Sequence, residues 1–94
     1  MFLLIAYDVA TATPEGERRL RRVARACLDY GQRVQKSVFE CRLGPIDWAR
    51  LRERLQKEIN LAEDSLRIYY LDAGVQVEHV GAKQPEDLQG PLIV

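Results

Sequence analysis

The sequence contains little that supports a site built from cysteine or histidine. It has two cysteines and one histidine in 94 residues. Cys27 and Cys41 do not stand in a C-x-x-C or Cys/His spacing, so neither a metal cluster nor a redox pair is indicated, and both are expected to be small core residues. His79 falls on an expected strand late in the chain, where a surface or packed side chain is a better interpretation than a catalytic base.

Net charge and long apolar runs are missing too. The 14 Lys and Arg residues balance 14 Asp and Glu residues, so total charge does not indicate a nucleic-acid partner. The apolar start, residues 1–7, is far too short to span a bilayer and lacks the basic flank and cleavage site of a signal peptide. A cytoplasmic protein with no membrane partner is predicted. The charge is uneven, because residues 1–46 carry 8 basic and 5 acidic side chains and residues 47–94 carry 6 and 9.

The length of the chain bounds its organisation. A chain of 94 residues fits a single domain, and a domain of this size buries only about 60–65% of its unfolded surface. A second copy that covers an apolar face would therefore stabilise it. We expect residues 1–80 to form the domain and residues 81–94 to form a C-terminal arm, which is polar from Gly81 to Gly90.

Hydrophobic patterning predicts alternating strands and helices. The run Phe2–Tyr7 is apolar on both alternating faces, as in a central strand covered above and below. Thr13 is a helix N-cap candidate followed by proline, and Gly31 is a stop signal. The expected elements are a strand at 2–7, a helix at 14–30, a hairpin at 33–43 with a tight turn or bulge near Lys36-Ser37, a helix carrying the stripe Trp48, Leu51, Leu55 and Ile59, and strands at 66–71 and 75–80.

This order predicts an α+β, ferredoxin-like β-α-β-β-α-β fold with an additional C-terminal strand. Both helices then cover one face of the sheet. The apolar back of the first strand needs another cover, and a two-fold homodimer with sheets packed face to face is the simplest one.

Three segments carry a resemblance to a known family. These are Tyr7-Asp8 at the end of the apolar first strand, the string R-V-Q-K-S-V-F-E at 33–40, and D-S-L-R-I-Y at 64–69. Over roughly residues 1–80, the chain resembles the small CRISPR-associated endonuclease family that partners the CRISPR integrase in the adaptation module. The resemblance implies a homodimer in which an aspartate from each subunit holds Mg²⁺ or Mn²⁺, cleavage of RNA or DNA, and a scaffold role with the integrase.

Asp8 is the residue that the resemblance assigns to the metal and to catalysis, with Tyr7 beside it. The alternative is a solvated strand end or a local cap for the following loop. One carboxylate is a poor Mg²⁺ site, since the ion takes about six oxygens. Two copies of Asp8 near a two-fold axis would hold one hydrated ion, which would stabilise phosphate charge and activate water for phosphodiester hydrolysis.

Five arginines are candidates for binding nucleic acid through phosphate contacts, which position a backbone without reading its sequence. Four lie on the first expected helix, where an ordinary solvated face is the alternative, and the fifth begins the 33–40 string. They are Arg18, Arg19, Arg22, Arg25 and Arg33. Phe39 is predicted at the dimer interface, where both it and Tyr7 are interpreted as core residues.

Three functions remain open on the sequence. The first is a metal-dependent endonuclease, the second is a non-catalytic adaptor that holds DNA for the integrase, and the third is a toxin-like ribonuclease of the VapD type. The apolar end Leu92–Val94 is expected to dock on the partner subunit or on the integrase by adding to a sheet edge. A frayed terminus is the alternative.

Overall fold

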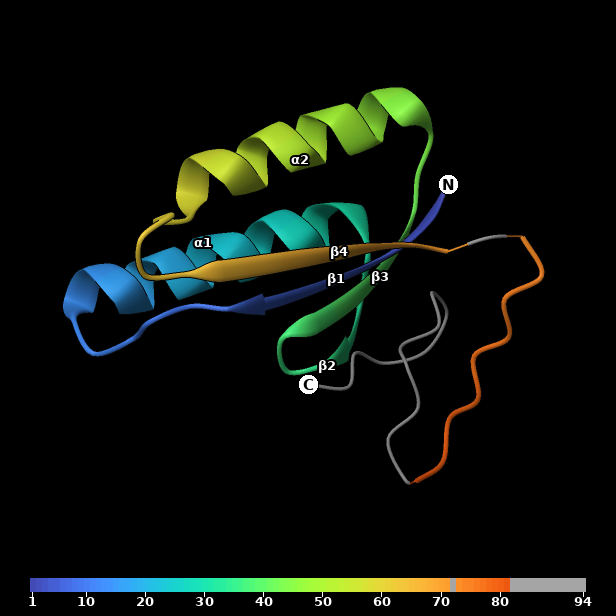
Figure 1. Ribbon diagram of the computed structural model, residues 1–94, viewed down its shortest axis with the longest axis horizontal. Coiled ribbons are helices and arrows are strands. Elements are labelled where there is room, and N and C mark those ends of the chain that lie inside the picture. The colour runs from blue at the N-terminus through green and yellow to red at the C-terminus, as the bar shows by residue number, and fades with distance from the viewer. Residues whose placement is uncertain (72, 82–94) are drawn as a thin grey trace.

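The protein is described here by a computed structural model, which covers residues 1–71 and 73–81. The chain runs through a strand, a helix, a two-stranded hairpin, a second helix and a final strand (Figure 1). The elements are β1 (Phe2–Asp8), α1 (Pro14–Tyr30), β2 (Gln32–Gln35), β3 (Val38–Arg42), α2 (Pro45–Glu58) and β4 (Ser65–Leu71).

The four strands form one antiparallel sheet in the order β2-β3-β1-β4. β1 lies in the middle because its apolar residues require cover on both sides. The two helices pack on a single face of the sheet and run in opposite directions along it (Figure 1). The predicted ferredoxin-like β-α-β-β-α-β arrangement is confirmed.

The ends of α1 follow from two local residues. The Thr13 hydroxyl accepts a hydrogen bond from the Gly16 N–H at 3.1 Å, which satisfies one of the free donors of the first turn. The Gly31 N–H donates to the Cys27 carbonyl at 2.8 Å. A Cβ at Gly31 would lie 2.3 Å from the Cys41 sulfur, so glycine is needed there for close packing. Both predicted ends of this helix are confirmed.

The strand pairing in the hairpin has a register shift, which determines the face of the sheet on which its side chains lie. A turn at Lys36-Ser37 joins β2 to β3, and the pairing register shifts between Arg33 and Gln35. This shift is the phase break that the sequence predicted near the turn. It places Arg33 opposite Phe39, on the face of the sheet that the helices cover.

The core lies between the sheet and the helices. Leu3, Ile5 and Phe39 have no exposed surface, and the two cysteines are buried with them. Burial raises the pKa of the Cys27 thiol to about 12 and that of Cys41 to about 11, so both stay protonated and unreactive near neutral pH. Their predicted role as small core residues is confirmed.

Residues 75–80 differ from the prediction. They form no strand and are exposed. A strand exists only where a neighbouring strand completes its hydrogen-bond ladder, and these residues make no such ladder with β2 or β4. Most of the expected arm, including Leu92–Val94, lies outside the described residues. Among the helices that are described, neither is long and apolar enough to cross a membrane.

Candidate functional site

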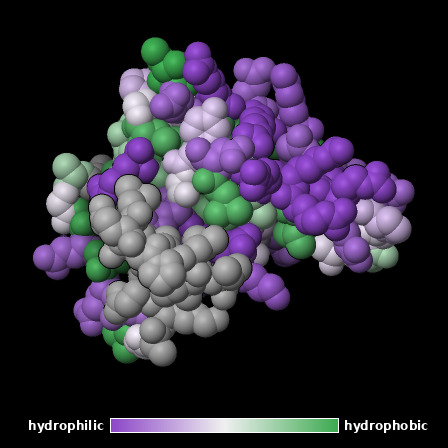
Figure 2. Space-filling model, turned by 180° about the vertical axis from the view of Figure 1, so that it is seen from behind, coloured by the Kyte–Doolittle hydropathy of each residue, from purple (hydrophilic) through white to green (hydrophobic). Residues whose placement is uncertain are grey.

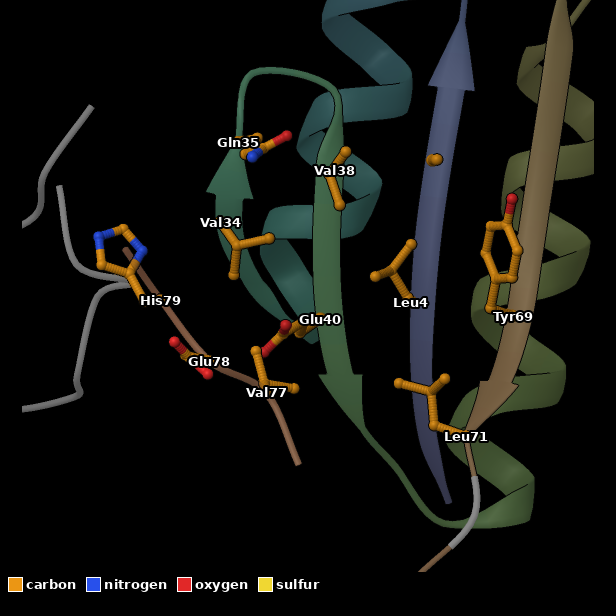
Figure 3. A pocket seen from close by; sticks show the side chains of 11 residues that line it. Leu4, Val34, Gln35, Val38, Glu40, Tyr69, Leu71, Val77, Glu78 and His79 are labelled. Atoms are coloured by element: carbon orange, nitrogen blue, oxygen red, sulfur yellow. The ribbon is translucent and has the colours of Figure 1, made fainter. Parts of the chain in front are cut away.

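The sheet has a second face, turned away from the helices, which we call the open face. Leu4, Val38 and Leu71 lie on this face on three strands (Figure 3), and each of them is half-buried. A hollow of about 540 Å³ lies over it and is bordered on one side by Val77, Glu78 and His79. The sheet residues that line this hollow include Leu4, Ala6, Val34, Val38, Tyr69 and Leu71.

Asp8 is the last residue of β1 and belongs to the open face. Leu3, Ile5 and Tyr7 are buried against the helices, so the alternation of a strand turns Asp8 to the other side. Asp8 is exposed and lies opposite Ser65, the first residue of β4. Within residues 1–71 and 73–81, none of the ion pairs involves its carboxylate. The carboxylate is therefore available to a ligand.

Tyr7 and Phe39 lie on the opposite side of the sheet from Asp8. Tyr7 is only 6% exposed and stacks on Phe39 with ring centroids 6.1 Å apart. Burial raises the pKa of Tyr7, and the nearby Arg33 guanidinium opposes that rise. The prediction of Tyr7 as a catalytic partner of Asp8 is corrected, because neighbouring strand residues point to opposite faces. Phe39 is 0% exposed within one subunit, so its prediction at a sheet-to-sheet interface is also wrong.

Arg33 is a half-buried residue on the helix-covered side. Its guanidinium carbon lies 5.1 Å from the centre of the Phe39 ring, in the range of a cation–π contact. Its Nε is buried, and no hydrogen-bond partner for it occurs among the residues that the structure describes. Arg33 thus packs beside Tyr7 and Phe39 rather than standing on an exposed phosphate-binding surface.

Three of the predicted arginines are exposed on α1. Arg18 is exposed, Arg22 lies 3.9 Å from Glu58, and Arg25 lies 3.6 Å from Asp29. Exposed pairs at these distances are weak and leave the guanidinium groups accessible. The end of the molecule where α1 begins and α2 ends is mostly hydrophilic in Figure 2. Because α1 covers the face opposite to Asp8, the fold does not gather these arginines around that carboxylate.

Arg19 has a different role from the one predicted for it. Its Nε donates to Asp64 at 2.8 Å and a terminal nitrogen donates to the same carboxylate at 3.3 Å. The Arg19 side chain is 17% exposed and that of Asp64 is 0% exposed. This hydrogen bond is the main reason why the pKa of Asp64 is lowered and that of Arg19 is raised. Sequence spacing could not reveal a pair 45 residues apart, and Arg19 is committed to Asp64 rather than to a phosphate.

We expect protonation of the Asp64 carboxylate to contribute to the fall in the free energy of unfolding at acidic pH. Its folded-state pKa is below the ordinary 3.8, so its contribution is complete well above that pH and is lost as the pH falls through the folded-state pKa. Asp64→Asn should flatten the decline in the free energy of unfolding as the pH falls from about 5 to below the ordinary pKa of 3.8. Urea unfolding at several pH values measures this. The exposed Asp29→Asn is the control, and an equal slope in wild type and Asp64→Asn would contradict the assignment.

Sequence reasoning missed Arg67 on the open face. Arg67 pairs with Ala6 across β1 and β4, two pairs away from Asp8 and Ser65 and therefore on the same face. Its Nε donates to the Tyr69 hydroxyl at 2.9 Å, and its guanidinium lies 5.5 Å from that ring. Strand alternation from Ser65 to Tyr69 is the signal that would have placed this arginine on the same face as Asp8.

These features define a class of protein, namely a small ferredoxin-like α+β protein with an exposed carboxylate on the rim of an apolar sheet face. The family model described as CRISPR associated protein Cas2 matches residues 1–78. The chain belongs to this family, as its resemblance predicted.

Relatives in the family are similar over nearly the whole chain. A CRISPR-associated endoribonuclease Cas2 from Nitratidesulfovibrio vulgaris is 56% identical to this chain. The match covers 100% of this chain and 94% of that protein. A CRISPR-associated endonuclease Cas2 from Halalkalibacterium halodurans is 50% identical, with 99% of each protein covered. The crystal structure of Streptococcus pyogenes Cas2 superposes with a TM-score of 0.77 at 48% identity, covering 86% of this chain and 100% of that one.

Proposed function

We propose that this chain is a metal-dependent endonuclease of CRISPR adaptation, which hydrolyses phosphodiester bonds of RNA or DNA as a homodimer and assembles with the CRISPR integrase. The observation that carries the proposal is the exposed Asp8 carboxylate, which has no ion-pair partner among residues 1–71 and 73–81. The names of the relatives as endoribonucleases or endonucleases support the same activity.

The donor set of one subunit fits half of a magnesium or manganese site. Asp8 offers the hard carboxylate oxygen that both ions prefer. No group of three or more His, Cys, Asp or Glu side chains that could hold a metal occurs in the described part of the chain. A second Asp8 from a partner subunit would complete the set. When bound, the ion would neutralise phosphate charge and lower the pKa of a water ligand.

The open face supports the proposed homodimer. Leu4, Ala6 and Val38 are apolar and half-buried within one subunit, and Asp8 stands at the rim of the same face. Packing two open faces together would remove this apolar surface from water, which is favourable in proportion to the area covered. The same packing would bring the two Asp8 residues toward the two-fold axis.

The protein's own residues have separate tasks in this proposal. Asp8 holds the ion, and Arg67 on the same face is suited to contact a phosphate close to it. Arg18, Arg22 and Arg25 are suited to contact the backbone farther from the scissile bond. Tyr7 is buried away from solvent, so it orders the core beneath Asp8 and does not transfer protons to substrate.

A non-catalytic adaptor is the second candidate, and one observation favours it. The exposed arginines of α1 do not face Asp8, so nucleic acid held by them need not reach the carboxylate. Such a dimer would hold DNA for the integrase without cutting it. A VapD-like toxin ribonuclease is a further alternative, which a gene neighbourhood without CRISPR repeats or an integrase gene would favour.

The test of the proposed function is cleavage by the purified wild-type protein. Single-stranded RNA and double-stranded DNA should each be offered with Mg²⁺, with Mn²⁺ and with a chelator. We expect at least one substrate to be cut when metal is present and to stay intact when the metal is chelated. Cleavage that persists in chelator contradicts the metal site, and tight binding without cleavage under all conditions favours the adaptor.

A further inference from the structure

Asp64 lies at a junction of three chain segments close to Asp8. Each oxygen of its carboxylate accepts two hydrogen bonds. One oxygen binds the Ala10 N–H at 3.1 Å and an Arg19 terminal nitrogen at 3.3 Å, and the other binds the Asn60 N–H and the Arg19 Nε, both at 2.8 Å. A buried carboxylate is tolerated when its charge is paired and its oxygens are satisfied. Both conditions hold here.

The hydrogen bonds of Asp64 act on the two strand ends that frame Asp8. Ala10 follows Asp8 by two residues at the end of β1, and Asp64 directly precedes Ser65, which lies opposite Asp8 in β4. Arg19 ties the same carboxylate to α1. The backbone on both sides of the pair formed by Asp8 and Ser65 is therefore joined through one side chain.

A second contact holds the same backbone from the helix side. A Cβ at Gly16 would lie only 2.0 Å from the Ala10 carbonyl oxygen. The first turn of α1 therefore packs directly on the loop that follows Asp8, which only glycine permits. Ala10 is fixed at its N–H by Asp64 and at its carbonyl by the approach of Gly16.

We infer that Arg19 and Asp64 are positioning residues that hold Asp8 in the orientation needed for metal binding. Asp8 makes none of the ion pairs found in the described part of the chain, so its direction is set by the backbone on which it stands. A charged junction restricts that backbone more than an apolar contact of the same size, because hydrogen bonds are directional. The inference rests on the proposed metal site at Asp8.

The test compares Asp64→Asn and Arg19→Gln with wild type. Mn²⁺ affinity, followed by electron paramagnetic resonance, should fall by about 10- to 100-fold, as for groups that orient a metal ligand. The kcat for nucleic-acid cleavage should fall with it, whereas KM should stay within about twofold because neither residue faces substrate. Arg19→Lys, which keeps the charge, should recover part of the lost affinity.

A destabilised control variant separates the positioning role of Arg19 and Asp64 from a purely structural role. Cys41→Ala removes a buried sulfur opposite Leu3, at the far end of β1. It should lower the melting temperature while leaving Mn²⁺ affinity as in wild type. If folded Asp64→Asn and Arg19→Gln bind Mn²⁺ as tightly as wild type does, the inference is overturned.

Amide hydrogen exchange separates this inference from the proposed function. Exchange at Val9 and Ala10 should speed up in Asp64→Asn, or in Arg19→Lys if the asparagine variant does not fold, but not in Cys41→Ala. Unchanged exchange overturns the positioning role. If wild type binds no Mn²⁺ while exchange responds as expected, the metal site fails and the junction stands as a restraint on Asp8.

Discussion

Asp8→Asn is expected to lower metal-dependent cleavage by at least about 100-fold, since an ion that stabilises phosphate charge contributes several kcal/mol and each 1.4 kcal/mol is tenfold in rate. Asparagine keeps the size of the side chain and one oxygen but removes the charge that attracts the ion. Rates of cleavage at saturating Mn²⁺ measure the loss. Asp47→Asn, which changes another exposed aspartate in the first turn of α2, is the matched control and should cut like wild type.

The same substitution should leave the fold and the dimer intact. Asp8 is exposed and contributes nothing to the core, so its circular dichroism spectrum and sedimentation should match those of wild type. Mn²⁺ should raise the melting temperature of wild type but not of the variant, because only a ligand bound to the folded state stabilises it. An Asp8→Asn protein that cuts at the wild-type rate would show that the metal lies elsewhere.

Leu4→Lys is expected to raise the dissociation constant of the dimer by at least about 100-fold, because burying an ion costs several kcal/mol and each 1.4 kcal/mol is tenfold in affinity. Leu4 lies on the open face opposite Glu40 and Tyr69. In a free subunit the new lysine remains in water and can pair with Glu40 across the strands. The subunit should therefore stay folded while the apolar interface is lost.

Light scattering at micromolar concentration and far-ultraviolet circular dichroism together test this expectation. We expect a folded monomer, and we expect it to cut nucleic acid poorly because each subunit supplies one Asp8. Gln56→Lys places the same charge on an exposed position of α2 and should remain dimeric and active. A Leu4→Lys protein that remains dimeric would show that the open face is not the interface.

Local patterns were enough to predict most of the fold. Thr13 and Gly31 bound α1 as predicted, because capping and stop signals act over three or four residues and depend little on the rest of the chain. The phase break in the hairpin was visible because a strand has a strict two-residue period. The same two-residue period predicted a strand at 75–80, and this strand does not form. The prediction was wrong because the period of a sequence does not show whether a partner strand is present.

Asp8 was proposed from the sequence through its place after an apolar strand and through the resemblance of the strings around it. The side chains that surround it were not. Tyr7 and Phe39 belong to the opposite side of the sheet, and Arg67 joins the side of Asp8, because the face of each residue depends on register between strands. Adjacency in the chain suggested the wrong neighbours for the site.

Element types, helix ends and the fold class depend on interactions within a few residues, and the order of amino acids specifies them directly. The pair formed by Arg19 and Asp64 depends on how the end of β1, the start of α1 and the loop before β4 meet in space. In the sequence, an arginine that faces water on a helix cannot be distinguished from one that faces a buried carboxylate. Only the folded chain distinguishes them, because the partner is 45 residues away and is brought close by packing rather than by sequence.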